Sequence, residues 1–228
     1  MEPSEAEIEA PKSSLLERAG GTVLGFVALA AIYLARMQAV AHSDGPKLFA
    51  SDGHPDAIHF LFAPTLALWR KVCGGLWLSD QYVATALSCV STAFAVVCLF
   101  WATRRFEGRR VALSTALLVA AAPAVFFYAT TIEIHATFLA VFGLVALATG
   151  EWLTRPTIAR GLLVGALCGF GYWMHNTGAL LPIVPVSMLI ARVGRSATRS
   201  TVATVLALVV AHVVVAGAGH LAFVPDNA

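Results

Sequence analysis

Long apolar segments alternate with short polar or charged segments along almost the whole chain. A helix needs about 20 predominantly apolar residues to cross the hydrocarbon core of a bilayer. Segments of this length, or somewhat shorter, occupy residues 19–41, 82–102, 111–130, 132–150, 161–174, 177–192 and 201–223. The pattern therefore predicts an all-α fold, a polytopic membrane helix bundle with about seven transmembrane segments.

The polar stretches indicate the domain organisation. Residues 1–18 are predicted to form a cytoplasmic polar tail, residues 19–223 a transmembrane helical domain, and residues 224–228 a short outer tail. The first outer loop covers about residues 42–80. Within it, residues 60–71 are too short and too basic at their end to span, which predicts an amphipathic helix lying in the membrane interface.

Lysine and arginine predict the orientation of the bundle. With the N-terminus in the cytoplasm, 11 of these residues lie inside and 3 outside, while Arg36 lies within the first span. Cytoplasmic loops carry the excess of Lys and Arg, so a cytoplasmic N-terminus is favoured. The small residues at 39–41 suit a signal-peptidase site, but the region before the first span is acidic where a signal peptide is basic. A retained signal anchor is therefore favoured over cleavage.

Residues 160–192 test this topology, because they are too long for one span and short for two. They predict a hairpin with its turn near residues 174–177. Its short arms would place the turn below the membrane surface, where backbone is tolerated only beside protein or a wet cavity. The pattern thus favours a cavity on the outer side. Gly161, Gly165 and Gly169 in the first arm predict close packing against another helix.

Composition then narrows the class of protein. Hydrophobic residues make up 58% of the chain, charged residues 12%, and the mean hydropathy is +0.78, whereas about 25% of residues are charged in an ordinary soluble domain. These values exclude a disordered chain, a disulfide-stapled secreted scaffold and a typical soluble enzyme. A net charge of +2 gives no case for a nucleic-acid partner. The four cysteines show no paired spacing, and three lie in apolar spans, as small core residues do.

Titratable groups gather on the predicted outer side. Six of the eight acids that follow the N-terminal tail fall there with six of the seven histidines, and only His212 maps to the interior of a span. Asp44 is the candidate catalytic residue, because it closely follows the first span and a carboxylate at the membrane surface can act as a general base. The alternative is a solvated loop whose aspartates form Asx turns. Three His and three Asp in this loop leave a divalent-metal site as an alternative. Their spacing is not that of a tight ligand set, so no metal ligand is assigned and no cofactor is certain.

Further candidates lie at the outer ends of other spans. Glu133 and His135 begin the fourth span, where a carboxylate is costly unless it faces a polar cavity or has a partner, and His135 is the neighbour at hand. His175 and Asn176 lie at the hairpin turn, where a structural hydrogen bond between helices is the alternative to a binding role. The basic end of the interfacial helix, with Arg70, either anchors that helix or meets a lipid phosphate.

Four short motifs follow one another in a characteristic order. They are Asp44-Gly45 after the first span, His54-Pro55 followed by residues 59–62, the segment 127–135 with Glu133 and His135, and the glycine-rich stretch 161–182 with His175-Asn176-Thr177. This order resembles the amino-terminal half of the membrane-embedded GT-C glycosyltransferases, which include the protein mannosyltransferase-like group. The resemblance covers about residues 20–200. Lys47 stands where the family often has a second acid, and the two-histidine form of the loop motif is reduced to Ala57-Ile58-His59.

The resemblance implies an enzyme, a hexosyltransferase that moves a sugar from a polyprenyl-phosphate donor to an unidentified acceptor at the outer face of the membrane. It implies an integral, multi-pass protein, expected in a bacterial inner (plasma) membrane, with membrane lipid and the lipid-linked sugar donor as partners. Asp44 would take the acceptor proton, and cationic groups would offset the charge of the leaving phosphate. The implied substrate-binding residues are Lys47, His54, His59, Arg70, Glu133, His135, His175 and Asn176.

Two further expectations concern the length of the chain and the alternative function. Known members of the family are about twice this length or more, so the chain is expected to be a fragment, a truncated product or a reduced relative. The alternative to an enzyme is a non-enzymatic polytopic membrane protein, either a transporter half or an assembly partner. A transport route predicts titratable groups at mid-bilayer depth, and only His212 is predicted there.

Overall fold

The computed structural model describes residues 15–38, 60–75, 79–193 and 199–223. The regular elements in these ranges are α-helices and one short 3-10 helix, η1. They are α1 (Leu15–Leu34), α3 (Phe62–Cys73), α4 (Asp80–Arg104), α5 (Arg109–Ala121), α6 (Pro123–Thr130), α7 (Ile134–Thr154), α8 (Ile158–Met174), η1 (Asn176–Leu180), α9 (Ile183–Val193) and α10 (Arg199–Phe223). The predicted all-α membrane bundle is confirmed.

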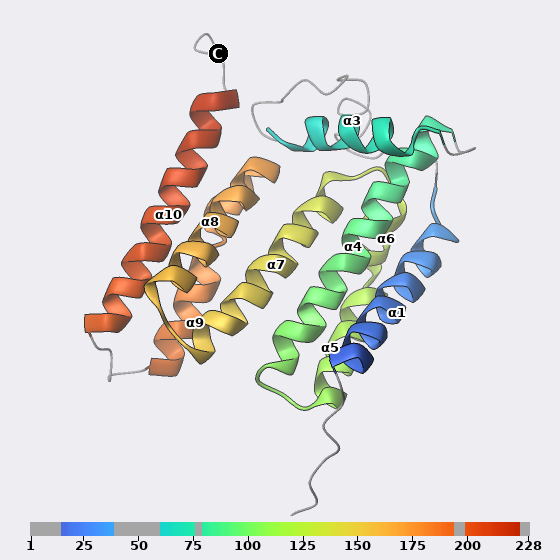
Figure 1. The fold of residues 1–228 in the computed structure, drawn as a ribbon. Coiled ribbons are helices and arrows are strands. Elements are labelled where there is room, and N and C mark those ends of the chain that lie inside the picture. The colour runs from blue at the N-terminus through green and yellow to red at the C-terminus, as the bar shows by residue number, and fades with distance from the viewer. Residues whose placement is uncertain (1–14, 39–59, 76–78, 194–198, 224–228) are drawn as a thin grey trace, which may run out of the picture.

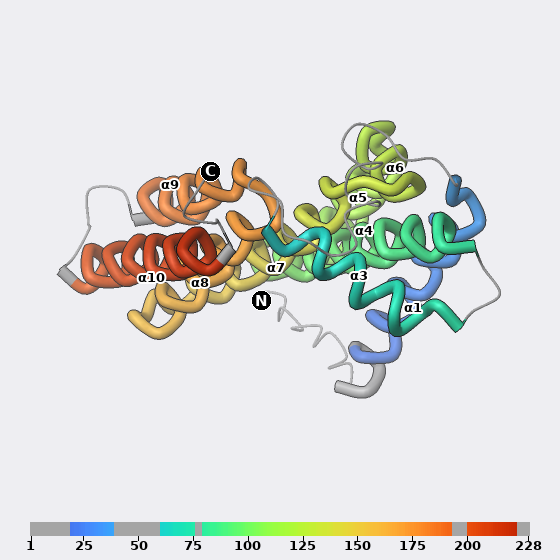
Figure 2. Tube along the Cα trace, turned by 90° about the horizontal axis from the view of Figure 1, so that it is seen from above, coloured from blue at the N-terminus to red at the C-terminus, as the bar shows by residue number. Residues whose placement is uncertain are grey.

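The long helices stand side by side, and α3 lies across one end of them (Figure 1). Seen along the bundle, α10, α8, α7 and α4 form a row, with α1 on one side of α4 and α5 and α6 on the other (Figure 2). The most extensive helix contacts follow this row, between α8 and α10, α4 and α7, and α7 and α8. We call the end covered by α3 the α3 end.

Arginines collect at the opposite end of the bundle, which we call the arginine end. There α4 finishes and α5 begins, α7 finishes and α8 begins, and α9 finishes (Figure 1). The residues concerned are Arg104, Arg105, Arg109, Arg110, Arg155, Arg160 and Arg192. The sidedness of charge inferred from the sequence therefore holds in the fold. That the arginine end faces the cytoplasm remains a prediction from the charge rule.

Helix length supports fewer membrane crossings than the hydropathy pattern predicts. Within the described residues, three helices are long and apolar enough to cross a membrane, namely α4, α7 and most of α10. The helices α5 and α6 qualify only as a pair, and that pair is bent by 61°. Shorter apolar helices cover Ala19–Leu34, Ile158–Met174 and Asn176–Arg192. About seven crossings therefore remains a prediction, with three or four supported by length.

The span expected at residues 111–130 is not one continuous helix but is broken between α5 and α6. The chain leaves helical geometry at Ala122, whose ψ is 128°, and Pro123 occupies the first turn of α6. Proline has no N–H to continue the ladder of α5, and its ring disfavours helical backbone at the preceding residue. Pro123 thus ends one helix and begins the next.

The hairpin and its glycines are as predicted. Helix α8 ends at Met174, η1 follows, and α9 returns, so the turn falls at residues 174–177. A Cβ atom on Gly161 would lie 2.5 Å from the carbonyl oxygen of Thr204, and one on Gly165 would meet the carbonyl of Leu208. These glycines let the backbones of α8 and α10 approach closely. Cys89, Cys98 and Cys168 are buried free thiols, which confirms their reading as small core residues.

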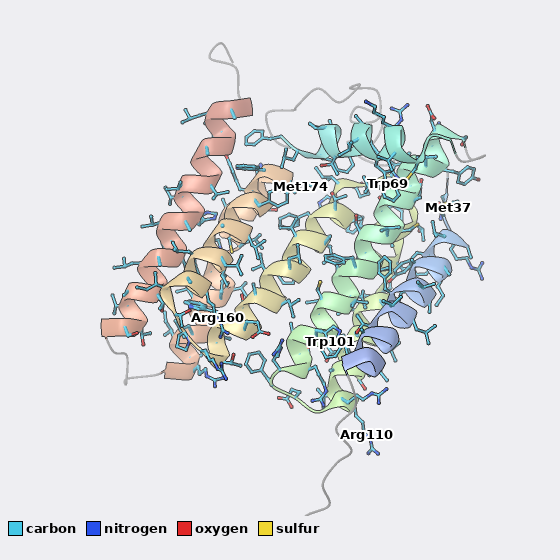
Figure 3. All side chains as sticks on the ribbon, in the orientation of Figure 1. Met37, Trp69, Trp101, Arg110, Arg160 and Met174 are labelled. Atoms are coloured by element: carbon cyan, nitrogen blue, oxygen red, sulfur yellow. The ribbon has the colours of Figure 1, made fainter. Side chains whose placement is uncertain are left out.

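Helix α3 has the amphipathic character expected of an interfacial helix. Phe62 and Leu66 are buried against the ends of the bundle, whereas Lys71 is exposed. The indole Nε1 of Trp69 donates a hydrogen bond to the carbonyl oxygen of Val83 at 2.7 Å, and Figure 3 shows Trp69 between α3 and the helices beneath it. This contact fixes α3 across the start of α4.

Candidate functional site at the α3 end

Glu133 is a buried carboxylate at the α3 end, directly before α7. Residues 131–133 are not helical, and Glu133 itself has extended backbone (φ −151°, ψ 136°). Its Oε1 atom accepts a hydrogen bond from the N–H of Ile134 at 3.1 Å, and the side chain is only 3% exposed. The positive end of the α7 dipole also favours a negative group here. The N-terminus of α7 therefore stabilises this buried carboxylate.

The backbone of Glu133 is held by a side chain from α4. The hydroxyl oxygen of Ser88 lies 3.4 Å from both the N–H and the carbonyl oxygen of Glu133. Ser88 is itself buried, so this pair of contacts lies inside the protein. The position of the carboxylate is thus set by α4 as well as by α7.

His135 is the partner of Glu133 that the sequence suggested. Its Nδ1 atom lies 2.8 Å from Oε1 of Glu133, and its ring stacks on that of Tyr128, with centroids 4.8 Å apart and an interplanar angle of 19°. A carboxylate only accepts, so Nδ1 carries a proton and, in the neutral ring, Nε2 is the acceptor. The His135 side chain is 44% exposed, which leaves one side of the ring facing out of the core.

His175 lies beside His135, but its neutral ring is the other tautomer. The two ring centroids are 5.3 Å apart. Nδ1 of His175 accepts the backbone N–H of Thr177 at 3.1 Å and lies 2.8 Å from its hydroxyl oxygen. Because a backbone N–H only donates, Nδ1 is unprotonated and the neutral ring carries its proton on Nε2. The site thus combines an imidazole acceptor, an imidazole donor and a carboxylate.

The described residues on both sides of segment 39–59 are bonded next to this group. The N–H of Gln38 donates to the carbonyl oxygen of Thr130 at 2.8 Å, three residues before Glu133. The N–H of Leu61 donates to the carbonyl oxygen of Trp173 at 2.9 Å, two residues before His175. The described residues that flank segment 39–59 are therefore bonded to backbone two or three residues before His175 and Glu133.

The predicted site residues fall into three sets. The structure brings Glu133, His135 and His175 together, and Asn176 follows as the exposed first residue of η1. Arg70 lies in the last turn of α3, where its guanidinium forms a 2.8 Å ion pair with Asp80. Asp44, Lys47, His54 and His59 lie outside the described residues.

Sequence reasoning missed several side chains that shape the group. Tyr128 stacks on His135, and Phe138 lies against His175 with ring centroids 5.6 Å apart. Tyr128 stands in the same short motif as Glu133, the segment 127–135, so its closeness in sequence could have identified it as a site residue. Ser88 had no such signal, because it reaches Glu133 across 45 positions of sequence.

The described residues give no set of ligands for a metal. No group of three or more His, Cys, Asp or Glu side chains in those ranges is arranged to hold an ion. The loop whose histidines and aspartates raised that question lies outside them.

The family model of dolichyl-phosphate-mannose-protein mannosyltransferases matches residues 64–219, well over half of the 228 residues. The chain belongs to this family. The matched region begins in α3 and ends in α10, so it includes Glu133, His135 and His175. No curated protein and no solved structure matches the chain.

Membership in the mannosyltransferase family confirms the resemblance to the protein mannosyltransferase-like group. The chain is accordingly a multi-pass integral membrane protein of the glycosyltransferase class. Its family implies a lipid-linked sugar donor and a membrane lipid environment.

Proposed function

We propose that this mannosyltransferase-family chain transfers a sugar from polyprenyl phosphate to an acceptor at the α3 end of the bundle, on the outer face of the membrane. The observation that carries the proposal is the group formed by Glu133, His135 and His175, together with the hydrogen bonds that fasten both flanks of segment 39–59 close to it in sequence. A family match alone indicates the class of enzyme. The geometry of this group supports the α3 end as the place of reaction.

Asp44 is the proposed base. It takes the proton of the acceptor hydroxyl while the acceptor oxygen bonds to the anomeric carbon, and the bond from that carbon to the phosphate oxygen breaks. Polyprenyl phosphate leaves with the electron pair. Asp44 is six residues beyond Gln38, and a chain of six residues reaches at most roughly 20 Å. Because Gln38 is bonded to Thr130, this reach includes the surroundings of Glu133.

Cationic groups offset the charge that develops on the leaving phosphate. Lys47 belongs to the same loop as Asp44, and Arg70 stands at the end of α3. The ion pair with Asp80 holds the guanidinium of Arg70 in place, so it meets a phosphate without first being ordered. His54 and His59 complete the proposed substrate contacts from the loop.

The two imidazoles recognise a sugar hydroxyl. A hydroxyl both donates and accepts, and the pair offers Nε2 of His135 as an acceptor and Nε2–H of His175 as a donor. Glu133 keeps the His135 ring in the tautomer that this requires, as an orienting carboxylate does for a catalytic histidine. Asn176 adds an amide beside His175. These residues bind the sugar and leave the proton transfer to Asp44.

The decisive experiment compares two aspartates of one loop. Asp44→Asn is expected to abolish transfer of radiolabelled mannose from polyprenyl phosphate in membranes that contain the protein. Asp52→Asn, which precedes Gly53 in a predicted turn, is expected to leave transfer unchanged. Transfer by Asp44→Asn at the parental rate would exclude Asp44 as the general base. Uptake of the labelled compound into vesicles without any transfer would instead favour the transporter alternative.

A further inference from the structure

A second feature of the fold lies at the arginine end, away from the Glu133 group. A cavity of about 970 Å³ opens between α1, α4 and α5. Figure 2 shows α1 and α5 on either side of α4, and all three helices contribute lining residues. Small-molecule sites are usually about 300–1,000 Å³. Its size is therefore that of a large ligand site.

Two glycines of α1 contribute to the cavity, because no other described residue fills the space in front of them. Gly21 and Gly25 line it, and a Cβ atom built on either would find no atom within 4 Å. Gly161 and Gly165 of α8 behave in the opposite way, since their missing side chains admit the backbone of α10. On α1 the glycines leave space, and the facing wall of α5 is apolar, with Leu113 and Leu117 exposed in it.

Three arginines stand where the cavity reaches the end of the bundle. Arg104, Arg105 and Arg109 all line it and are exposed. Arg105 pairs with Glu151, and the guanidinium of Arg104 donates to the carbonyl oxygen of Glu107 at 3.1 Å. Among the residues that the structure describes, neither Arg104 nor Arg109 has a carboxylate partner. The arrangement is an apolar groove with positive charge at one end.

We propose that this groove binds one anionic phospholipid, with an acyl chain between α1 and α5 and the phosphate on Arg104 and Arg109. Arginine pairs with phosphate through several parallel N–H donors, and basic pockets between membrane helices bind anionic headgroups. The groove and the membrane share a hydrocarbon interior, so an acyl chain enters without leaving an apolar medium. The occupant belongs to the leaflet at the arginine end.

The lipid of this groove is separate from the sugar donor of the α3 end. Glu133 contacts Ser88 of α4, which precedes Arg104 by 104 − 88 = 16 residues, or roughly 24 Å at 1.5 Å per residue. A headgroup on Arg104 therefore cannot place its phosphate beside Glu133. The expected role of the lipid is to fill the groove and hold α1 and α5 against α4.

Trp101 supplies a local reporter for the test. Its ring lines the cavity, and its Nε1 donates to the hydroxyl of Thr22 at 3.1 Å (Figure 3). The whole protein is reconstituted in phosphatidylcholine vesicles containing a small fraction of phosphatidylglycerol, with bromine on the acyl chains of one lipid at a time. Quenching of Trp101 is obtained by subtracting the Trp101→Phe signal. Brominated phosphatidylglycerol is expected to quench Trp101 more strongly than brominated phosphatidylcholine at the same fraction.

Variants separate the proposed site from general attraction to an anionic surface. Arg104→Gln and Arg109→Gln are each expected to weaken the preference for phosphatidylglycerol about fivefold, the effect of one basic residue near a headgroup. Arg110→Gln is the matched control, because Arg110 is exposed but does not line the cavity and projects away from the bundle (Figure 3). Gly25→Leu fills open space and is expected to fold while abolishing the quenching.

Three results would overturn the proposal. The first is equal quenching by the two brominated lipids, which would make the groove a place for any acyl chain. The second is an effect of Arg110→Gln as large as that of Arg109→Gln. The third is a preference that appears only after residues 1–14 are removed, which would assign the groove to the acidic tail. None of these results bears on sugar transfer at the α3 end.

Discussion

The Oε1 atom of Glu133 lies 2.8 Å from Nδ1 of His135, and the same oxygen accepts the N–H of Ile134. One carboxylate therefore caps α7 and orients an imidazole. If both functions matter, Glu133 and His135 should be energetically coupled. A double-mutant cycle with Glu133→Gln and His135→Ala is expected to give a coupling free energy of about 1–2 kcal/mol in transfer rate, the range for residues of one hydrogen-bonded pair.

The matched control for this cycle replaces His135 by Ala together with Thr137→Val. Thr137 also lies in the first turn of α7, but its hydroxyl donates to the carbonyl oxygen of Ile134. Its effects should simply add to those of His135→Ala. Additive effects of Glu133→Gln and His135→Ala would mean that the carboxylate acts only as a helix cap.

The Glu133 and His135 pairing could be predicted from the sequence, whereas its support could not. The two residues are close neighbours in sequence, and a carboxylate at the start of an apolar helix needs a partner. The contact with Ser88 and the approach of His175 depend on how α4 and α8 pack against α7. Distances between helices that are far apart in sequence leave no local pattern, so these contacts emerged only from the fold.

Glycine spacing shows the same limit more sharply. Gly21 and Gly25 on α1 and Gly161 and Gly165 on α8 share a four-residue spacing. On α8 the spacing brings a helix close, and on α1 it leaves a cavity. The difference lies in the neighbour, which the spacing does not encode. Pro123, by contrast, was a visible local signal for the break between α5 and α6.

His175 allows its structural and binding roles to be separated. Asparagine at this position offers a side-chain oxygen that can accept the N–H of Thr177, as Nδ1 does, but it lacks Nε2–H. His175→Asn is therefore expected to keep the unfolding temperature of the parent protein. Its KM for the sugar donor is expected to rise about 3–10-fold, the worth of one neutral hydrogen bond. His175→Ala should lose both properties. Steady-state kinetics with thermal unfolding in detergent checks this, and an unchanged KM for His175→Asn would exclude the proposed contact with sugar.

The α8–α10 contact should be intolerant of side chains at the α8 glycines. A Cβ atom on Gly165 would collide with the carbonyl of Leu208, so Gly165→Val must move one backbone. We expect a loss of at least about 2 kcal/mol, within the range for overpacking. Gly217 in α10 meets nothing within 4 Å, and Gly217→Ala should raise stability by about 0.5–1 kcal/mol through helix propensity. Unfolding in sodium dodecyl sulfate measures both, and equal behaviour of the two variants would contradict the packing.

Arg70 and Asp80 form a partly exposed ion pair, with side chains 27% and 67% exposed, and the pair distinguishes anchoring from phosphate binding. Exposed pairs contribute only about 0.2–1 kcal/mol, so neither Arg70→Gln nor Asp80→Asn should unfold the protein. If the guanidinium offsets the phosphate charge, Arg70→Gln lowers kcat/KM for the lipid-linked donor, because the stabilising charge is gone. Asp80→Asn keeps that charge and removes only the exposed carboxylate partner, so its kcat/KM should stay within about fivefold of the parent, the equivalent of about 1 kcal/mol. Measured with labelled polyprenyl-phosphate mannose, equal losses in both variants would show that the ion pair serves only to fasten α3 to α4, and Lys47 would then be left as the cation of the site.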